Sequence, residues 1–268
     1  MSEEFDYFME SPDEISRLDL KTNFDLVASQ ARWAGIEPGM RVIDVGCGIG
    51  KTSFFLSQLV GDKGEVVGLD ASPQRIAYAR EQFGRDNLTF CCQNIHAPLA
   101  HLGQFDFLWT RFFLEYHKEK SFQIVKSLAE LLRQSGIMCL VDLDYNCMSH
   151  YGIPLRLENT ILQNLKILEE KFDFDPFVGR KLYTYLYDLG FADIDVFVGT
   201  HHLFFGDLDE VDAFNWLKKV EVTSKKGEYR FEEYPGGYDE FLEEFKEAFF
   251  KPRRFTYTPV IQCRGVKK

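Results

Sequence analysis

The chain has 268 residues, of which 45% are hydrophobic and 27% charged, a balance typical of a folded globular protein and unlike that of a disordered chain. With 31 Lys and Arg against 42 Asp and Glu, its net charge is -11, so its field repels nucleic-acid phosphates and anionic membrane surfaces. This length suits one α/β domain with an insertion better than two independent domains. We therefore expect a single domain that does not act on nucleic acid.

The sequence shows no membrane-spanning or secretory signal. No apolar run approaches the roughly 18 residues that cross a bilayer, and the first residues, MSEEFDYFMESPDE, are acidic where a signal peptide is basic and then apolar. We expect a cytoplasmic protein without membrane insertion. The six cysteines lack CxxC spacing, and His201 and His202 of a predicted strand would point to opposite faces. We therefore predict neither a disulfide framework nor a metal site.

From the start of the chain, hydrophobic spacing predicts two helices and then a regular alternation of strands and helices. Residues 1–36 fit two amphipathic helices that end at GIEPGM. β-branched and apolar runs then predict five strands, MRVIDV, EVVGLD, NLTFCCQNI, FDFLWTRF and IMCLVDLDY. Three helices are predicted among them, KTSFFLSQLV, SPQRIAYAREQF and SFQIVKSLAELLRQSG, the last closed by its glycine. This alternation predicts a parallel sheet with right-handed crossovers.

In the remaining sequence, strands and helices no longer alternate regularly. Helical spacing covers residues 154–172, 178–189, 207–222 and 237–250, and strands are predicted in DIDVFVGTHHLFF and FTYTPVIQCRG. The segment between these two strands, about 50 residues, is too long for a hairpin loop. Its helices either cover a substrate pocket or complete the core. The aromatic residues nearby could line an apolar or aromatic pocket or belong to the core.

A glycine-rich loop, GCGIG, follows the first predicted strand at residues 46–50. Glycines let the chain turn sharply there and let a ligand approach the main chain. A phosphate-binding P-loop would need a glycine at Val45, although GKT resembles its end. A dinucleotide-binding GxGxxG would need its third glycine at Lys51. The spacing therefore disfavours both kinds of site.

VIDVGCGIGKTS resembles the first motif of class I S-adenosylmethionine-dependent methyltransferases, in which an acidic strand residue precedes a GxGxG loop. GLDASPQRIAYAR resembles their second motif, QFDFLWTRFFLEYH their fourth, and LAELLRQSGIMCLVD a stretch commonly seen as LLKPGG. These motifs cover about residues 38–145 in the order and at the intervals of the family. The chain is similar to small-molecule enzymes of the ubiquinone and menaquinone methyltransferase-like group.

The resemblance, with the element order, predicts an α/β fold with a doubly wound, mostly parallel seven-stranded sheet, helices on both faces and helical lid or insertion elements. We divide the chain into an N-terminal helical cap (1–36), a Rossmann-like core that binds the cofactor S-adenosylmethionine (37–145) and a C-terminal part of the same domain (146–268). Lid segments are expected at about 146–180 and 205–252.

The resemblance also implies which residues bind the cofactor. The glycine loop would cradle its methionine part, and Asp70, 20 residues beyond Gly50, would accept hydrogen bonds from the two ribose hydroxyls. The third strand ends in Gln-Asn-Ile instead of the usual Gly-Asp-Ala, and Asn94 would still pair with the adenine edge beside the backbone of Ile95. The predicted set is Arg17, Asp44, Gly46, Cys47, Gly48, Gly50, Asp70, Ala71, Asn94, Ile95, Thr110 and Arg111.

Three of these residues also fit other roles. Asp44 lies inside an apolar strand, so loop amides or the amino group of the cofactor should accompany its carboxylate. Arg111, at the ligand-binding edge of the sheet, either orients a methionyl or substrate carboxylate or pairs with Glu115. Arg17 either contacts the cofactor or lies on a solvated helix face.

The chemistry requires mainly that nucleophile, methyl carbon and sulfur lie in line, with a proton removed where the nucleophile carries one. Five candidate bases follow the fourth and fifth strands: Glu115, Tyr116, His117, Tyr145 and His150. We favour Tyr116 and His117. The predicted function is methyl transfer to an O, N or C nucleophile of a small-molecule metabolite, whose identity and the oligomeric state have no sequence signal. The alternatives are a non-catalytic cofactor-binding module and, less favoured, an NAD-dependent oxidoreductase.

Overall fold

The computed structural model describes residues 14–146 and 148–268, so the start of the first predicted helix lies outside it. Two helices, α1 (Glu14–Lys21) and α2 (Phe24–Ala34), precede the sheet. Helix α2 ends at Gly35, whose φ of 98° is a left-handed conformation that glycine adopts at low cost. The predicted helix end at GIEPGM is therefore confirmed.

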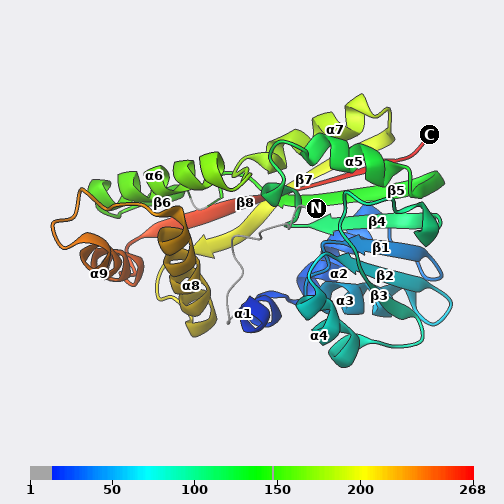
Figure 1. Cartoon of the computed structure of the whole chain (residues 1–268), viewed down its shortest axis with the longest axis horizontal. Coiled ribbons are helices and arrows are strands. Elements are labelled where there is room, and N and C mark those ends of the chain that lie inside the picture. Colours follow the sequence, from blue (N-terminus) through cyan, green and yellow to red (C-terminus); the bar gives the residue numbers. More distant parts are fainter. Residues whose placement is uncertain (1–13, 147) are drawn as a thin grey trace.

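Five parallel strands form the centre of the sheet, in the order β3-β2-β1-β4-β5 (Figure 1). The chain winds outward from β1 in both directions, as a doubly wound sheet requires. Helices cover both faces, so the central strands are apolar on both sides. These elements are β1 (Arg41–Val45), α3 (Lys51–Val60), β2 (Glu65–Asp70), α4 (Pro73–Phe83), β3 (Leu88–Cys92), η1 (Ala100–Leu102), β4 (Phe105–Arg111), η2 (Leu114–Tyr116), α5 (Ser121–Ala129) and β5 (Leu132–Leu143).

The predicted end of one helix is wrong. The sequence pattern extends the helix to Gly136, but α5 ends at Ala129. Leu132 instead pairs with Phe105 of β4, and the register between these strands shifts once before the regular ladder continues. The burial and backbone hydrogen bonds that β5 gains beside β4 outweigh the helical preference of this short segment.

The C-terminal part adds antiparallel strands. Strand β8 (Phe255–Val266) pairs with β5 and with β7 (Ala192–Phe204), and its first residues pair with β6 (Ser149–Tyr151). Because β6 is too short to show a period of two, the sequence predicted seven strands where the described chain has eight. The mostly parallel α/β fold is confirmed. The helices here are α6 (Leu155–Lys171), η3 (Val178–Lys181), α7 (Leu182–Asp188), α8 (Glu210–Gly227) and α9 (Gly237–Phe249).

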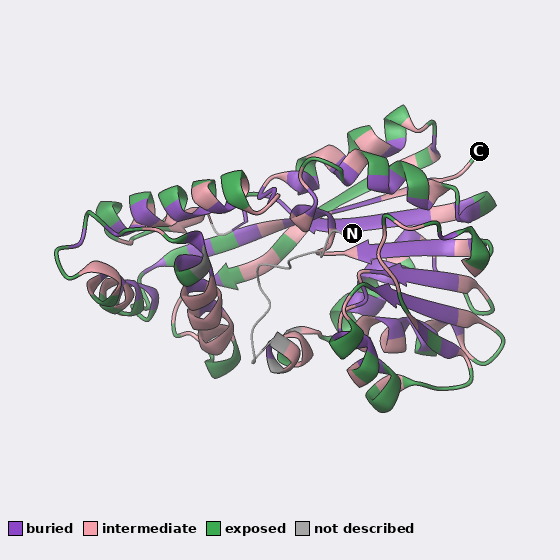
Figure 2. Cartoon of the chain, viewed as in Figure 1, coloured by how far each residue is buried: buried purple, intermediate pink, exposed green. Residues whose placement is uncertain are grey.

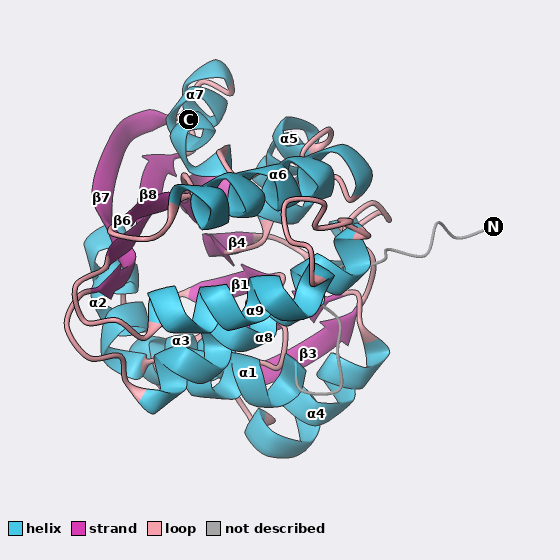
Figure 3. Cartoon of the chain, turned by 90° about the vertical axis from the view of Figure 1, so that its left-hand side faces the viewer, coloured by secondary structure: helices cyan, strands magenta, loops and turns pink. Residues whose placement is uncertain are grey.

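The buried apolar residues form three clusters. Two cover the two faces of the parallel sheet, whose strands are almost wholly buried in Figure 2. The third lies away from them, among α6, α8 and α9, which we call the distal helical region. Figures 1 and 3 show α6 on one side of the far end of β8 and α8 and α9 on the other. The core of this region is aromatic: Trp216, Phe241, Phe245 and Phe249 are each at most 3% exposed.

In the described ranges, no helix combines the length and the apolar character needed to cross a membrane. The cysteines described there are free thiols, and Cys47, Cys139 and Cys263 are buried, as the sequence predicts for thiols in apolar runs. Cys147 lies outside the described residues.

Candidate functional site

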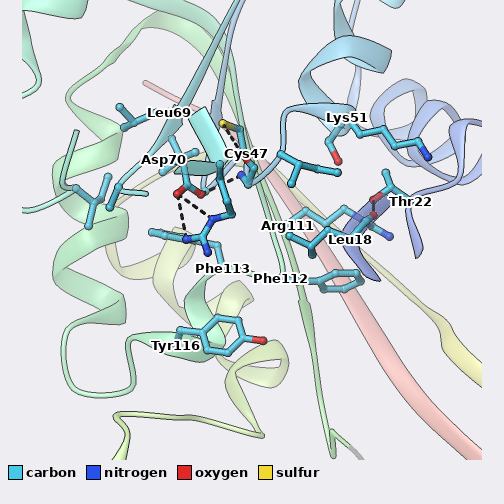
Figure 4. Close-up of a pocket in the computed structure, with 18 of the residues that line it drawn as sticks. Leu18, Thr22, Cys47, Lys51, Leu69, Asp70, Arg111, Phe112, Phe113 and Tyr116 are labelled. Atoms are coloured by element: carbon cyan, nitrogen blue, oxygen red, sulfur yellow. Dashed lines mark hydrogen bonds and ion pairs between the residues drawn. The ribbon is translucent and has the colours of Figure 1, made fainter. Parts of the chain in front are cut away.

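A cavity opens where β1, β2 and β4 end, beside α1 (Figure 4). Parallel α/β sheets bind ligands at this edge, because the loops of neighbouring strands diverge there. Most of the predicted site residues line the cavity: Arg17, Gly46, Cys47, Gly48, Asp70, Ala71, Asn94, Ile95, Arg111, Tyr116 and His117. Three others are buried outside its lining: Asp44, Gly50 and Thr110.

The three glycines of the loop have different surroundings. Gly46, Gly48 and Gly50 have φ values of 74°, 56° and 85°, all in the left-handed region. Gly46 and Gly48 line the cavity. A Cβ on Gly50 would lie 2.7 Å from Ala79 Cβ and from the Phe90 ring. The last glycine therefore serves the close packing of the loop against α4 and β3.

Asp70 ends β2 with its carboxylate at the cavity wall (Figure 4). Its Oδ2 accepts a hydrogen bond from Gly48 N and its Oδ1 one from Ser72 N, both at 2.9 Å. The Arg75 guanidinium donates to Oδ1 at 3.2 Å and 3.3 Å. A carboxylate has about four lone-pair positions, and Oδ2, which accepts one hydrogen bond from the described residues, has room for a ligand hydroxyl.

Asp44 is buried in β1, and its partner differs from the one expected. Ser53 Oγ of α3 donates to Asp44 Oδ2 at 2.6 Å, in place of the expected loop amides. Burial raises the pKa of Asp44 to about 7, although the Ser53 hydrogen bond and the Arg111 charge oppose this rise. Asp44 thus joins β1 to the helix that follows the glycine loop.

Arg111, at the end of β4, does not form the expected pair with Glu115. Its Nε donates to Gln30 of α2 at 3.3 Å, and its Nη2 is buried without a hydrogen-bond partner among the described residues. Burial lowers the pKa of Arg111 to about 10, with Asp44 and Asp142 acting in the opposite direction. An unsatisfied guanidinium N–H at a cavity is suited to an anionic oxygen.

Helix α1 closes one side of the cavity. Arg17 is 6% exposed and lines the cavity, so a solvated position is wrong for this residue. Lys51, the first residue of α3, forms an ion pair with Asp19 of α1 at 2.9 Å. Leu18 and Thr22 of the same segment also face the cavity (Figure 4). The ion pair therefore ties α1 to the end of the glycine loop.

The edge predicted to face adenine follows β3. Asn94 Oδ1 accepts a hydrogen bond from His96 N at 2.9 Å, which holds the segment in a turn. Ala71, Asn94 and Ile95 all line the cavity next to Asp70. Their contact with adenine stays a prediction.

Tyr116 and His117 lie at the other wall, after β4. The Tyr116 ring lies against that of Phe174, with centroids 5.9 Å apart. His117 is 3% exposed, and burial, with a smaller contribution from His96, lowers its pKa to about 3. His117 is therefore uncharged at neutral pH and a weak base. The catalytic roles of both residues stay predictions.

Sequence reasoning missed Arg75, Phe112 and Phe113 as cavity residues. A signal was present for each. Arg75 lies in the first turn of a helix that follows the acidic strand end, a position that turns it back towards Asp70. The two phenylalanines directly follow Arg111 at the ligand-binding edge, inside a motif that was recognised as a whole.

The expected orientation of His201 and His202 is wrong. Their ring centroids lie 4.1 Å apart, because the register of β7 against β8 shifts between Thr200 and His202 and a bulge changes the alternation of faces. Within residues 14–146 and 148–268, no cluster of three or more His, Cys, Asp or Glu is placed to hold a metal.

Comparison with known proteins shows the family. The methyltransferase domain family matches residues 36–178, more than half of the chain. The chain belongs to the methyltransferase domain family. This confirms the predicted family and enzyme class, whose class I members use S-adenosylmethionine as the methyl donor.

Two curated relatives share part of this methyltransferase domain. The 2-methyl-6-phytyl-1,4-hydroquinone methyltransferase of Synechocystis sp. is 30% identical over 151 residues, 54% of this chain and 46% of that protein. The protein-L-isoaspartate O-methyltransferase of Thermotoga maritima is 30% identical over 87 residues, 31% of this chain and 27% of that protein. The chain spans less than half the length of both. The first relative agrees with the predicted similarity to quinone-related enzymes.

Solved structures share the fold of this methyltransferase at low identity. A cyclopropane-fatty-acyl-phospholipid synthase-like protein from Lactobacillus casei has a TM-score of 0.60 and 14% identity, covering 99% of this chain and all of that chain. An N-methyltransferase from Haemonchus contortus, solved with phosphomonomethylethanolamine and S-adenosylhomocysteine, has a TM-score of 0.62 and 14% identity, covering 98% of this chain and 60% of that chain. The fold therefore extends beyond the matched domain.

Proposed function

We propose that this protein transfers a methyl group from S-adenosylmethionine to an O, N or C nucleophile of a small molecule. The observation that carries the proposal is that one cavity combines the Asp70 carboxylate with the buried, unpartnered Nη2 of Arg111. A ligand that has hydroxyls at one part and a carboxylate at another meets both needs. The net charge of -11 supports a small molecule rather than a nucleic acid, and we keep the cytoplasm as the predicted place of action.

Each side chain has a defined task in this proposal. Asp70 accepts hydrogen bonds from the two ribose hydroxyls while it stays paired with Arg75. Arg111 donates from Nη2 to the methionyl carboxylate, while Gln30 holds its Nε. The backbone at Gly48 admits the methionine part closely because no Cβ projects there, whereas the missing Cβ of Gly46 makes room for the Phe113 ring.

The acceptor side of the cavity is formed by Tyr116 and His117. When bound, S-adenosylmethionine supplies an electrophilic methyl group on a sulfonium, which is already a good leaving group. The protein then has to align the nucleophile and exclude water. With a pKa near 3, His117 contributes an uncharged wall, which leaves Tyr116 as the better placed of the two to contact a nucleophile.

Calorimetric titration with S-adenosylhomocysteine tests the cofactor half of the proposal. Asp70→Ala and the milder Asp70→Asn should each weaken binding at least about tenfold, because hydrogen bonds to a charged group contribute about 1.5–3 kcal/mol. Asp62→Ala, which changes an exposed carboxylate in a turn, is the matched control and should change nothing. Unchanged affinity in both Asp70 variants, or no binding by the wild type at high micromolar ligand, contradicts the proposal.

Turnover separates an enzyme from a non-catalytic binding module. The protein is incubated with methyl-labelled S-adenosylmethionine and a small-molecule extract, and label transfer to the extract is measured. We expect extract-dependent transfer that Asp70→Asn reduces. Tight S-adenosylhomocysteine binding without any transfer would favour the binding module instead.

A further inference from the structure

A second and smaller cavity lies next to the first and shares Tyr116 with it. Its walls come mainly from α6, α8 and α9, the distal helical region. The lining is mostly apolar and includes the rings of Phe174, Trp216, Phe241 and Phe245. Tyr116 borders both cavities, so its side chain forms a wall that they share. This pocket therefore has the position of an acceptor site beside the first cavity.

One cation interrupts the apolar lining. Lys219 of α8 lines this pocket, and its Nζ donates to Asn146 Oδ1 at 3.1 Å and lies 5.6 Å from the Trp216 ring. Within the described residues no carboxylate forms an ion pair with it. The neighbouring Lys225 of the same helix pairs with Glu221 at 2.7 Å. Lys219 is half-buried at this pocket, and its ammonium group has no direct ion-pair partner among the described residues.

The partner of Lys219 is itself held in place. Asn146 is 2% exposed, and its Nδ2 donates to Glu115 Oε2 at 2.7 Å. This bond directs the amide oxygen of Asn146 towards the ammonium group. Glu115 is buried beside the turn that carries Tyr116. The hydrogen bonds from Lys219 to Asn146 and from Asn146 to Glu115 therefore hold one cation at the pocket wall. They also connect this cation to the turn that borders the cofactor cavity.

A second donor lies on the same helix face. Trp216 precedes Lys219 by three residues, so both project from one side of α8. The indole Nε1 of Trp216 is buried and has no hydrogen-bond partner among residues 14–146 and 148–268. Since a buried N–H without a partner costs free energy, this atom is also suited to an acceptor atom of a ligand.

We propose that the second cavity binds the methyl acceptor and that this acceptor is an acid with an aromatic or otherwise apolar body, whose anionic group pairs with Lys219. The inference rests on the proposed methyl transfer and specifies its substrate class. The four rings of the pocket contact the apolar body. The ammonium of Lys219 supplies the missing counter-ion, and Tyr116 contacts the body where it reaches the cofactor cavity.

The test compares two probes of the same shape, 2-naphthoate and its neutral amide, 2-naphthamide. Both are titrated by calorimetry into protein saturated with S-adenosylhomocysteine. We expect the wild type to bind the acid at least about tenfold more tightly than the amide. Lys219→Met should reduce this preference to within about twofold, while Lys219→Arg, which keeps the charge, should retain it. Lys225→Met, on the exposed part of the same helix, is the matched control and should also retain it.

The outcomes separate this inference from the proposed function. Failure of the wild type to bind S-adenosylhomocysteine contradicts the proposed function itself. If S-adenosylhomocysteine binds but 2-naphthoate does not, or if acid and amide bind equally, the acid-binding inference is overturned. A preference that persists in Lys219→Met also overturns it, provided that circular dichroism shows the variant to be folded.

Discussion

The cofactor cavity and the distal helical region satisfy their buried polar groups in different ways. Beside the cofactor cavity, Asp142 accepts hydrogen bonds from the backbone N–H groups of three successive residues, Phe113 to Glu115, and Asp44 is paired with Ser53. In the distal region, Trp216 Nε1 and Asn164 Oδ1 are buried without a hydrogen-bond partner among the described residues. The buried carboxylates of the first site are therefore held in place before any ligand arrives, with Arg111 Nη2 left as a donor for a ligand, whereas the distal region leaves an indole N–H and an amide oxygen.

This difference fits two separate roles for the two regions, cofactor binding at the strand ends and acceptor binding among the helices. A cofactor that never changes is served by a rigid site built on strand ends, because strands hold their side chains firmly. The proposed acceptor pocket, formed by helices, can vary without disturbing that site. Three predictions test how far the two regions are independent.

The largest expected effect comes from removing one ring from each region. Phe245 in the distal region and Phe107 in the parallel sheet are both fully buried, so Phe245→Ala and Phe107→Ala should each lower the free energy of unfolding by about 3–5 kcal/mol. Urea unfolding measures this. Phe245→Ala should leave S-adenosylhomocysteine affinity within about twofold, since Phe245 does not line the first cavity. A tenfold loss of that affinity would show that the two regions are coupled.

A smaller effect is expected in the glycine loop. Gly50→Ala adds a Cβ 2.7 Å from Ala79 and Phe90 at a φ of 85°, so it should cost about 3 kcal/mol through strain and overpacking. Gly39→Ala is the control, because Gly39 has nearly the same φ, 87°, but no atom within 4 Å of the added Cβ. We expect about 1–2 kcal/mol there, from the backbone conformation alone. Equal costs in urea unfolding would rule out the packing role of Gly50.

The smallest effect concerns pH. The pKa of Asp44 is about 7 in the folded protein against an ordinary value of 3.8, so between these pH values the folded state binds the additional proton. The contribution of this group to stability is therefore present below pH 4 and is lost as the pH rises towards 7.

Asp44→Asn, which keeps an oxygen for Ser53, should flatten this dependence. The slope of unfolding free energy against pH in cofactor-free protein should change by at most about 1.4 kcal/mol per pH unit between pH 5 and 7. Urea titrations at several pH values measure it. Parallel slopes for the wild type and the variant would mean that Asp44 is already ionised in the folded state.

Local patterns predicted many of the residues that line the first cavity, because these residues lie within a few positions of the strand ends that carry them. Asp70 and the glycine loop are examples. The partners of these residues were not predictable: Gln30 reaches Arg111 from a distant helix, and Ser53 replaces the expected loop amides around Asp44. The pocket with Lys219 and Asn146 joins residues 73 positions apart. The spacing of apolar residues in α8 predicts a helix, but it does not predict which residues its polar side chains contact.

The position of β8 has a consequence for how the chain is made. Strand β8 is synthesised after β5, β6 and β7, yet it pairs with each of them. Until it arrives, the edge of β5, apolar and rich in unpaired backbone groups, has no partner strand on that side. Such an edge is open to pairing with other chains. During synthesis, the nascent protein therefore depends on the rapid arrival of β8, or on a chaperone that covers β5, to avoid aggregation.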